Sequence, residues 1–284
     1  MDRLEQLGKR TWNQTAVLLA ALAMVIVGGC EGQGPLPVET LAPTDAAVIV
    51  PTKNPDESDL KLISAQLAAW FDDNGGCELP CWWGIEPGET TWMEVEETFV
   101  PYTAAVFQTG REKRLVFNVS DEINPYGAFE LTLIFDTQWV VEEIILGSWT
   151  LEPEQYSLAN VLARFGEPDQ VWAIAAVQYI QSFSLTVFYE AEGLYFLYTG
   201  EGIPESEETV LLCPANIQQA ESPLIQIWEP GLHESLTEIY PSYQDVYRLK
   251  DITDWNTNRF YQTYQSPENY SICIEFPTAY AVDS

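Results

Sequence analysis

The sequence predicts an α+β fold: tandem units of one or two helices packed on an antiparallel β-sheet, preceded by a signal peptide and a disordered tether. Three observations predict it. A helix-start pattern at residues 85–95 recurs at residues 151–161, runs with strand-like alternation follow each copy, and an apolar leader precedes both. The domains that we expect are a signal peptide (1–29), a Pro/Thr-rich tether (30–58), a first helix-plus-sheet unit (59–150) and a second unit with a C-terminal extension (151–284).

The composition is that of a folded, strongly acidic chain. Hydrophobic residues make up 46% of the 284 residues, which is enough for a sizeable core. Twelve basic residues face 43 acidic ones, and the formal net charge of −31 repels nucleic acid phosphates and anionic lipid headgroups. We therefore expect no nucleic acid partner. The charge favours solubility at an exposed surface, and the alternative is a cationic or metal-bearing partner.

The N-terminal residues predict export and a lipid anchor. Residues 15–27 form an apolar run with the length of a signal-peptide core, short for a membrane span of about 20 apolar residues. Val27-Gly28-Gly29-Cys30 resembles the bacterial lipobox, in which the cysteine thiol accepts diacylglycerol. The resemblance implies lipid attachment at Cys30, on the outer face of the cell membrane or in the outer membrane. An ordinary signal peptide or an uncleaved anchor is the alternative, and Glu31 leaves the choice of membrane open.

A tether and one helix come next. Residues 31–58 hold five prolines among threonines and glycines, a composition typical of a semi-extended linker that we expect to lie outside the fold. Residues 59–73 have apolar side chains at helical spacing, and the Asn-Gly-Gly sequence at 74–76 ends this predicted helix.

Four cysteines remain when Cys30 is assigned to lipid, and in an exported chain they predict two disulfides. Of the three possible pairings we favour Cys77–Cys81 with Cys213–Cys273, because a local pair needs little loop closure and the distant pair lies in similar strand-like contexts. A redox site at the local pair is the alternative, although its spacing is C-x3-C rather than C-x-x-C. We expect no metal and no cofactor, since the chain has one histidine, His233.

Residues 77–84, which we call the clasp, contain two adjacent tryptophans and have no second copy. In an extended backbone Trp82 and Trp83 would point to opposite sides, one into the core and the other over the disulfide. The alternative is that the outward ring binds a protein or stacks on a sugar. Trp92, at the first helix start, completes the set of candidate binding residues.

Each unit is predicted to begin with a capped helix and to continue as an antiparallel meander. Thr91 and Glu94 have the spacing of a capping box. In the second unit the predicted helix begins after Ser157 and ends at Gly166. The strands that we expect are at residues 115–119, 129–135, 139–146, 171–177, 183–189, 194–198, 224–228 and 271–276. A third, weaker helix start lies at 235–238, and residues 240–264 show no clear period.

The sequence resembles two families at these helix starts. Residues 85–95 and, more plainly, 156–171 show a helix that is followed by Gly-x-Pro and a strand, which is similar to small outer-membrane assembly lipoproteins of the BamE type and to β-lactamase inhibitory proteins. The resemblance implies helices on one face of an antiparallel sheet, and protein–protein binding at the cell envelope without catalytic residues. The first copy departs from the pattern, with Pro101-Tyr102-Thr103 after its helix. Cys81-Trp82-Trp83-Gly84 belongs to neither family and would mark a separate lipoprotein group.

We expect a non-catalytic protein-binding or assembly module of the cell envelope. The sequence has no Gly-x-Ser-x-Gly nucleophile elbow, and we expect His233 to be solvent-exposed at a helix start. Paired carboxylates for glycoside hydrolysis stay open because acidic residues are abundant. The alternative function is a carbohydrate-binding or carbohydrate-hydrolysing surface lipoprotein that uses exposed tryptophans. The expected partners are the membrane, through Cys30, and another envelope or extracellular protein; the oligomeric state is left open.

Overall fold

The computed structural model describes residues 47–49, 57–118, 128–147, 154–176, 182–217, 223–240 and 246–281. The chain divides into two units, Met1–Thr44 and Asp45–Ser284, and all of these residues belong to the second. The predicted signal peptide, the lipid-attachment residue Cys30 and most of the predicted tether lie outside the described residues.

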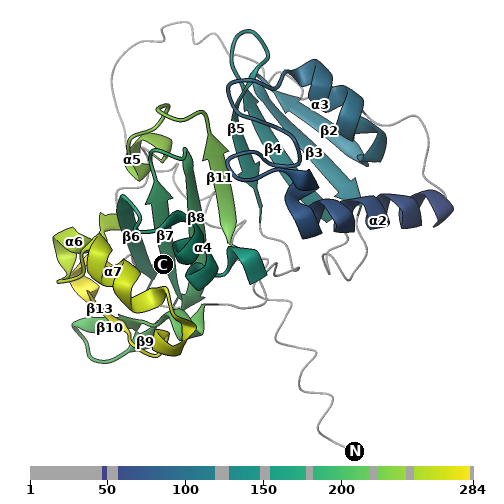
Figure 1. Ribbon diagram of the computed structural model, residues 1–284. Helices are drawn as coiled ribbons and strands as arrows, with labels where there is room; N and C mark the ends of the chain where they lie inside the picture. Colours follow the sequence, from purple (N-terminus) through teal and green to yellow (C-terminus); the bar gives the residue numbers. More distant parts are fainter. Residues whose placement is uncertain are drawn as a thin grey trace, which may run out of the picture. The chain divides into compact units, whose positions relative to one another are not determined.

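The described residues form one ten-stranded antiparallel sheet and a three-stranded sheet (Figure 1). The order in the large sheet is β1-β2-β3-β4-β5-β11-β8-β7-β6-β12, and in the small sheet β13-β10-β9. The strands of the large sheet are β1 (Ala47–Ile49), β2 (Ala105–Thr109), β3 (Glu112–Asn118), β4 (Ala128–Phe135), β5 (Val141–Leu146), β6 (Gln170–Ala176), β7 (Ser182–Tyr189), β8 (Leu194–Glu201), β11 (Leu224–Trp228) and β12 (Tyr247–Arg248). Those of the small sheet are β9 (Ile203–Pro204), β10 (Thr209–Leu212) and β13 (Ile274–Pro277).

Strand β11 joins two meanders into the large sheet. It pairs with β5, where Ile227 lies opposite Ile144, and with β8, where Ile227 lies opposite Leu194. Its side chains are buried on both faces of the sheet, because Ile227 on one face and Gln226 on the other are at most 2% exposed. A strand that is apolar on nearly every side chain takes a central position.

The prediction of tandem helix-plus-sheet units is therefore wrong. The two meanders do not make separate sheets, each covered by its own helices; they share one large antiparallel sheet that carries few, short helices. The physical reason is β11, which we expected to close the second sheet and which instead hydrogen-bonds to a strand of each meander.

The helices are α2 (Glu57–Asp73), α3 (Trp92–Phe99), α4 (Leu158–Phe165), α5 (Leu236–Ile239), α6 (Leu249–Ile252) and α7 (Thr257–Tyr264). All of these helices except α5 pack on one face of the large sheet, and α5 lies on the other. Short 3-10 helices lie at Asn74–Gly76, Val100–Tyr102, Glu154–Tyr156, Pro214–Asn216, Pro267–Asn269 and Thr278–Tyr280. Leu67 of α2, Val95 of α3 and Val161 of α4 are fully buried in one hydrophobic core with the strands.

The opposite face of the sheet is covered over part of its width. There the ring of Trp228 packs with Phe188, Tyr195 and Trp172, and Leu236 of α5 closes this second cluster. The cluster explains why β7 and β8 carry aromatic side chains on both faces.

Two parts of the chain differ from the expected boundaries. Ala47–Ile49, which lies in the predicted tether, forms strand β1 and pairs with β2. The stretch 240–264, which shows no clear period, contains α6 and α7, and Asn256 caps α7 by accepting a hydrogen bond from the Arg259 N–H.

Candidate functional site

The two predicted disulfides are confirmed. Cys77 and Cys81 are bonded with their Cα atoms 5.8 Å apart, and Cys213 and Cys273 with theirs 4.2 Å apart. The second bond ties the chain just after β10 to the residue before β13, so it holds the outer strands of the small sheet together.

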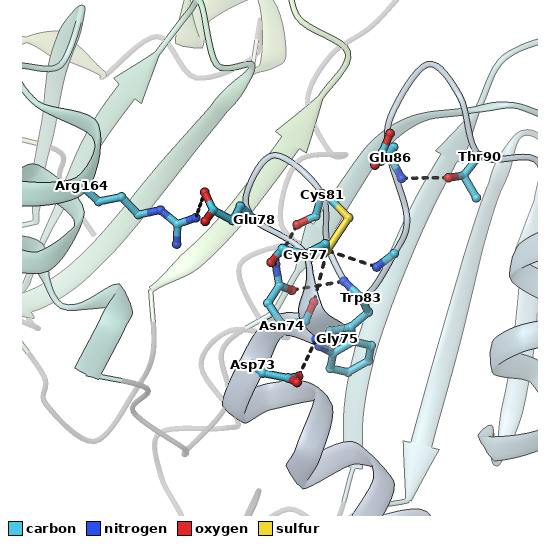
Figure 2. The surroundings of a disulfide bond; sticks show 11 residues. Asp73, Asn74, Gly75, Cys77, Glu78, Cys81, Trp83, Glu86, Thr90 and Arg164 are labelled. Atoms are coloured by element: carbon cyan, nitrogen blue, oxygen red, sulfur yellow. Dashed lines mark hydrogen bonds and ion pairs between the residues drawn. A yellow bond between two sulfur atoms is a disulfide. The ribbon is translucent and has the colours of Figure 1, made fainter.

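Asn74 holds the clasp in place (Figure 2). Its side-chain amide donates to the carbonyl oxygens of Cys81, at 2.8 Å, and Cys77, at 3.0 Å. Its side-chain oxygen accepts from the Trp83 N–H at 3.2 Å. Because Asn74 is buried, these bonds satisfy backbone groups that water does not reach.

The clasp closes on a tight turn at Trp83-Gly84. Trp82 and Ile85 exchange two backbone hydrogen bonds, of 2.9 Å and 2.8 Å, across the turn. Trp83 has a φ of 54° and Gly84 a φ of 83°, the left-handed conformation that a type I′ hairpin turn requires at both central positions. The backbone is thus not extended at Trp83.

Trp82 and Trp83 are both core residues, so the expectation that the two rings point to opposite sides is wrong, and neither is the outward ring of the alternative interpretation. Trp82 is 0% and Trp83 4% exposed. The Trp83 ring lies 5.3 Å from Trp70, 5.0 Å from Phe71 and 5.5 Å from the ring of Phe129. The turn sends both rings inward, so neither can serve as a stacking platform for a sugar at the surface.

The outward side of the clasp is acidic instead of aromatic. The Glu78 side chain is 93% exposed and lies 3.7 Å from the Arg164 guanidinium of α4 (Figure 2). Gly84 and Glu86 are exposed as well. An exposed ion pair of this kind contributes at most about 1 kcal/mol to stability.

Trp92, the third candidate, lies in a different setting. Its backbone N–H donates to the Trp139 carbonyl at 2.8 Å, which ties the start of α3 to the β4–β5 connection. The predicted capping box is confirmed: Glu94 accepts from both the N–H and the hydroxyl of Thr91 at 2.8 Å. These hydrogen bonds lower the pKa of Glu94.

Lys113 of β3 fills the space between the two tryptophan rings. Its Nζ atom lies 3.9 Å from the ring centroid of Trp92 and 5.0 Å from that of Trp139, and it donates to the Gln108 side-chain oxygen at 2.7 Å. The lysine side chain is buried, and this desolvation lowers its pKa, an effect that nearby Glu96 opposes. The ammonium therefore holds the two rings in position.

We call Trp92, Met93, Lys113 and Trp139 the tryptophan corner. Two of its side chains face solvent, since Met93 is 72% and Trp139 40% exposed. Four exposed glutamates lie on α3 and in the turn before it: Glu89, Glu94, Glu96 and Glu97. The sequence signal for this site was Trp92 alone; Met93 follows it in the sequence, and Lys113 and Trp139 join Trp92 only through the fold.

His233 is half-buried, which corrects its expected exposure. Its Nε2 atom lies 3.2 Å from Glu143 Oε1, its side chain is 16% exposed, and its ring meets the Trp228 ring edge-on at 5.5 Å. Glu143 also accepts from the Gln226 amide, and Gln226 accepts from the Tyr195 hydroxyl at 3.0 Å. The histidine therefore anchors the segment after β11 to the sheet.

The structure adds two findings about metals and membranes. The described residues contain no group of three or more His, Cys, Asp or Glu side chains that could hold a metal ion. No helix within the described ranges is long and apolar enough to cross a membrane.

The comparisons with known proteins leave the site to be interpreted from its own geometry. No protein-family model, curated protein or solved structure matches this chain, and neither of the two resembled families is identified.

Proposed function

We propose that this protein is a cell-envelope lipoprotein, anchored through Cys30, that acts as a non-catalytic protein-binding module. The observation that carries the binding part is the tryptophan corner, where Met93 and Trp139 expose large apolar side chains on two segments joined by a backbone hydrogen bond. Tryptophan and methionine are enriched at the centres of protein interfaces. The lipobox sequence ending at Cys30 supports the anchor.

The partner that fits this surface is a protein with a basic patch. Exposed glutamates lie on α3, which carries Met93 of the corner, and in the preceding turn, and the chain carries a net charge of −31. Charges at the rim of an interface set its on-rate and its choice of partner. The corner would supply the apolar contact and the glutamates the charge complementarity.

Site-specific photo-crosslinking tests this proposal. A photoreactive residue at Met93 should capture one partner protein with a basic surface in intact cells. The matched control is Leu62 on α2, which is also apolar and is 67% exposed but lies outside the corner.

Binding of the captured partner, once that protein is purified, should weaken with rising salt. The Trp139→Ala variant should bind it roughly tenfold more weakly or worse, as expected of an interface tryptophan. Equal capture from both positions, or unchanged affinity in Trp139→Ala, would contradict the proposal.

Carbohydrate binding is the second candidate, and the exposed Trp139 ring is the observation that favours it. A glycan would stack on the Trp139 ring, because the rings of Trp82 and Trp83 are buried. Saturable binding of a cell-wall glycan that is lost in Trp139→Ala, without capture of a protein at Met93, would favour this candidate over the first.

A further inference from the structure

The Cys77–Cys81 disulfide is more accessible at one of its two cysteines. Cys77 is half-buried, whereas Cys81 is 7% exposed. The loop between the two cysteines reaches the surface at Glu78, whose side chain is 93% exposed. Thiol–disulfide exchange begins when a thiolate attacks a disulfide sulfur that it can reach. The Cys77 Sγ atom is therefore the side of this bond that a thiolate from another molecule attacks.

The backbone around Cys77 Sγ suits a reduced sulfur as well as a disulfide (Figure 2). The Asn74 carbonyl oxygen lies 3.2 Å from Sγ, where it accepts from a Cys77 thiol when the bond is open. The Gly84 N–H donates to the same Sγ atom at 3.3 Å, and a hydrogen bond to the charged form of a thiol stabilises the thiolate. The thiol and the thiolate of Cys77 thus each have a partner on the clasp.

The clasp keeps its shape without this bond. The Asn74 side chain holds the carbonyl groups of both cysteines, and the backbones of Trp82 and Ile85 pair across the turn. The bond joins residues with a sequence separation of 4, and a loop this short constrains the unfolded chain less than a long one. Reduction of Cys77–Cys81 therefore leaves the clasp folded, with both thiols where the bond can form again.

The Cys213–Cys273 bond differs from this pair and serves as an internal reference. It joins residues with a sequence separation of 60, so it constrains much more of the unfolded chain. The described residues place one hydrogen-bonding group near its sulfurs, the Ser271 carbonyl oxygen 3.5 Å from Cys273 Sγ. A carbonyl oxygen accepts from a thiol but does not stabilise a thiolate. This pair therefore has the features of a structural disulfide.

We propose that Cys77–Cys81 is a reversible redox site that exchanges two electrons with a dithiol protein. A thiolate of that protein attacks Cys77 Sγ, the Cys77–Cys81 bond breaks, and Cys81 leaves as a thiolate that takes up a proton from water. The second thiolate of the partner then attacks the partner's own sulfur in the mixed disulfide. This step oxidises the partner to a disulfide and releases Cys77 as a thiolate, which the Gly84 N–H stabilises until it is protonated. The site is separate from the tryptophan corner and does not depend on the proposed protein-binding function.

A redox titration of the purified full-length protein measures both bonds in one sample. The protein is equilibrated with reduced and oxidised dithiothreitol, free thiols are alkylated, and peptide mass spectrometry quantifies each pair. Cys77–Cys81 should be half reduced at a ratio of reduced to oxidised dithiothreitol about tenfold lower than the ratio for Cys213–Cys273. The Trp82 and Ile85 amides should keep their protection from hydrogen exchange after Cys77–Cys81 opens, because the clasp stays folded.

Cysteine variants in intact cells test the direction of attack. Cys81→Ser removes the thiol that would resolve a mixed disulfide at Cys77, so this variant should accumulate a reducible adduct between Cys77 and one cysteine of a cysteine pair in the partner. Cys77→Ser leaves only the buried Cys81 and should form about tenfold less adduct. Cys213→Ser is the matched control, since it frees the half-buried Cys273 and should not capture this partner.

Three results would each overturn the redox site. The two disulfides are half reduced at the same ratio, opening of Cys77–Cys81 removes the protection of the clasp amides, or Cys81→Ser captures no more of the partner than Cys213→Ser does. Protection of the Trp82 and Ile85 amides in the unlinked variants excludes misfolding as the cause of lost capture.

Discussion

Asn74 is the residue on which the clasp depends most. Its side chain makes three hydrogen bonds to the backbone of the clasp, at Cys77, Cys81 and Trp83, and it is 6% exposed. It also has a φ of 54°, a conformation that asparagine tolerates better than most residues. One amide side chain therefore sets the path that buries both clasp tryptophans.

We expect Asn74→Ala to lower the free energy of unfolding by about 2–3 kcal/mol, because it leaves buried backbone groups of the clasp without partners. Asp73→Ala is the control, since Asp73 accepts a single exposed hydrogen bond from the Gly75 N–H and should lose less than about 1 kcal/mol. Denaturant unfolding monitored by tryptophan fluorescence measures both. Equal losses in the two variants would show that the Asn74 bonds do not hold the clasp.

The sequence did not predict the orientation of the two clasp tryptophans or the contact of His233. The alternation rule for adjacent tryptophans requires an extended backbone, and Trp83 is in a turn with positive φ. Asn74, whose bonds shape that turn, lies nine residues before Trp83, and no local pattern links them. The favoured cysteine pairing is confirmed; it followed from the short spacing of Cys77 and Cys81, a local pair that needs little loop closure. The contact of His233 with Glu143 joins residues ninety positions apart and has no sequence signal.

Among the elements, helix α4 is surrounded by tyrosines. The Tyr198 hydroxyl donates to the Tyr156 carbonyl just before the helix, and the Tyr189 hydroxyl donates to the Gly166 carbonyl at its end. Tyr270 accepts from the Ala159 N–H in its first turn. Burial raises the pKa of all four tyrosines.

This arrangement predicts instability in alkali. Since the folded-state pKa values are raised, the unfolded chain releases its phenolic protons first, and the folded chain binds more protons above about pH 10. Full stability should therefore hold below pH 10 and fall as the pH rises from there, by up to about 1.4 kcal/mol per pH unit for each tyrosine. Unfolding free energies measured between pH 8 and 11 test this. Tyr198→Phe removes one titrating group, so the unfolding free energy of this variant should fall less steeply with pH. An equally steep fall would contradict the prediction.

Helices with apolar residues at helical spacing and a capping residue at their start were predictable from the sequence. Helix α7 and strand β1 were not. Helices α3 and α4 begin one residue after Thr91 and Ser157, as their sequences indicate, because capping and apolar spacing are local. Helix α7 is aromatic and polar around most of its surface, with Phe260 and Tyr264 buried, so its sequence shows no clean apolar stripe. Strand β1 lies within a proline-rich segment whose composition predicts a tether, so the sequence did not indicate a strand there.

For the whole molecule, the two predicted helix starts are present, but the predicted tandem units are not. Both helix starts form where expected, yet β11 gives the two meanders a common sheet. A sequence pattern shows that Leu224–Trp228 is a strand, but not which neighbours it will have, because strand order depends on packing between distant segments. The shared sheet carries the tryptophan corner, on β3–β5 and α3.

Native-state hydrogen exchange of the β5 and β11 amides tests this single sheet most directly. Strands paired on both edges exchange only when the whole structure opens, whereas exposed edges exchange through local opening. If β11 joins the meanders, the paired amides around Ile144 and Ile227 should exchange with the free energy of global unfolding, as we also expect for those of β3–β4 and β7–β8. Exchange of β5 and β11 through a clearly lower-energy opening, while both flanking meanders stay protected, would mean that the chain folds as two separate sheets.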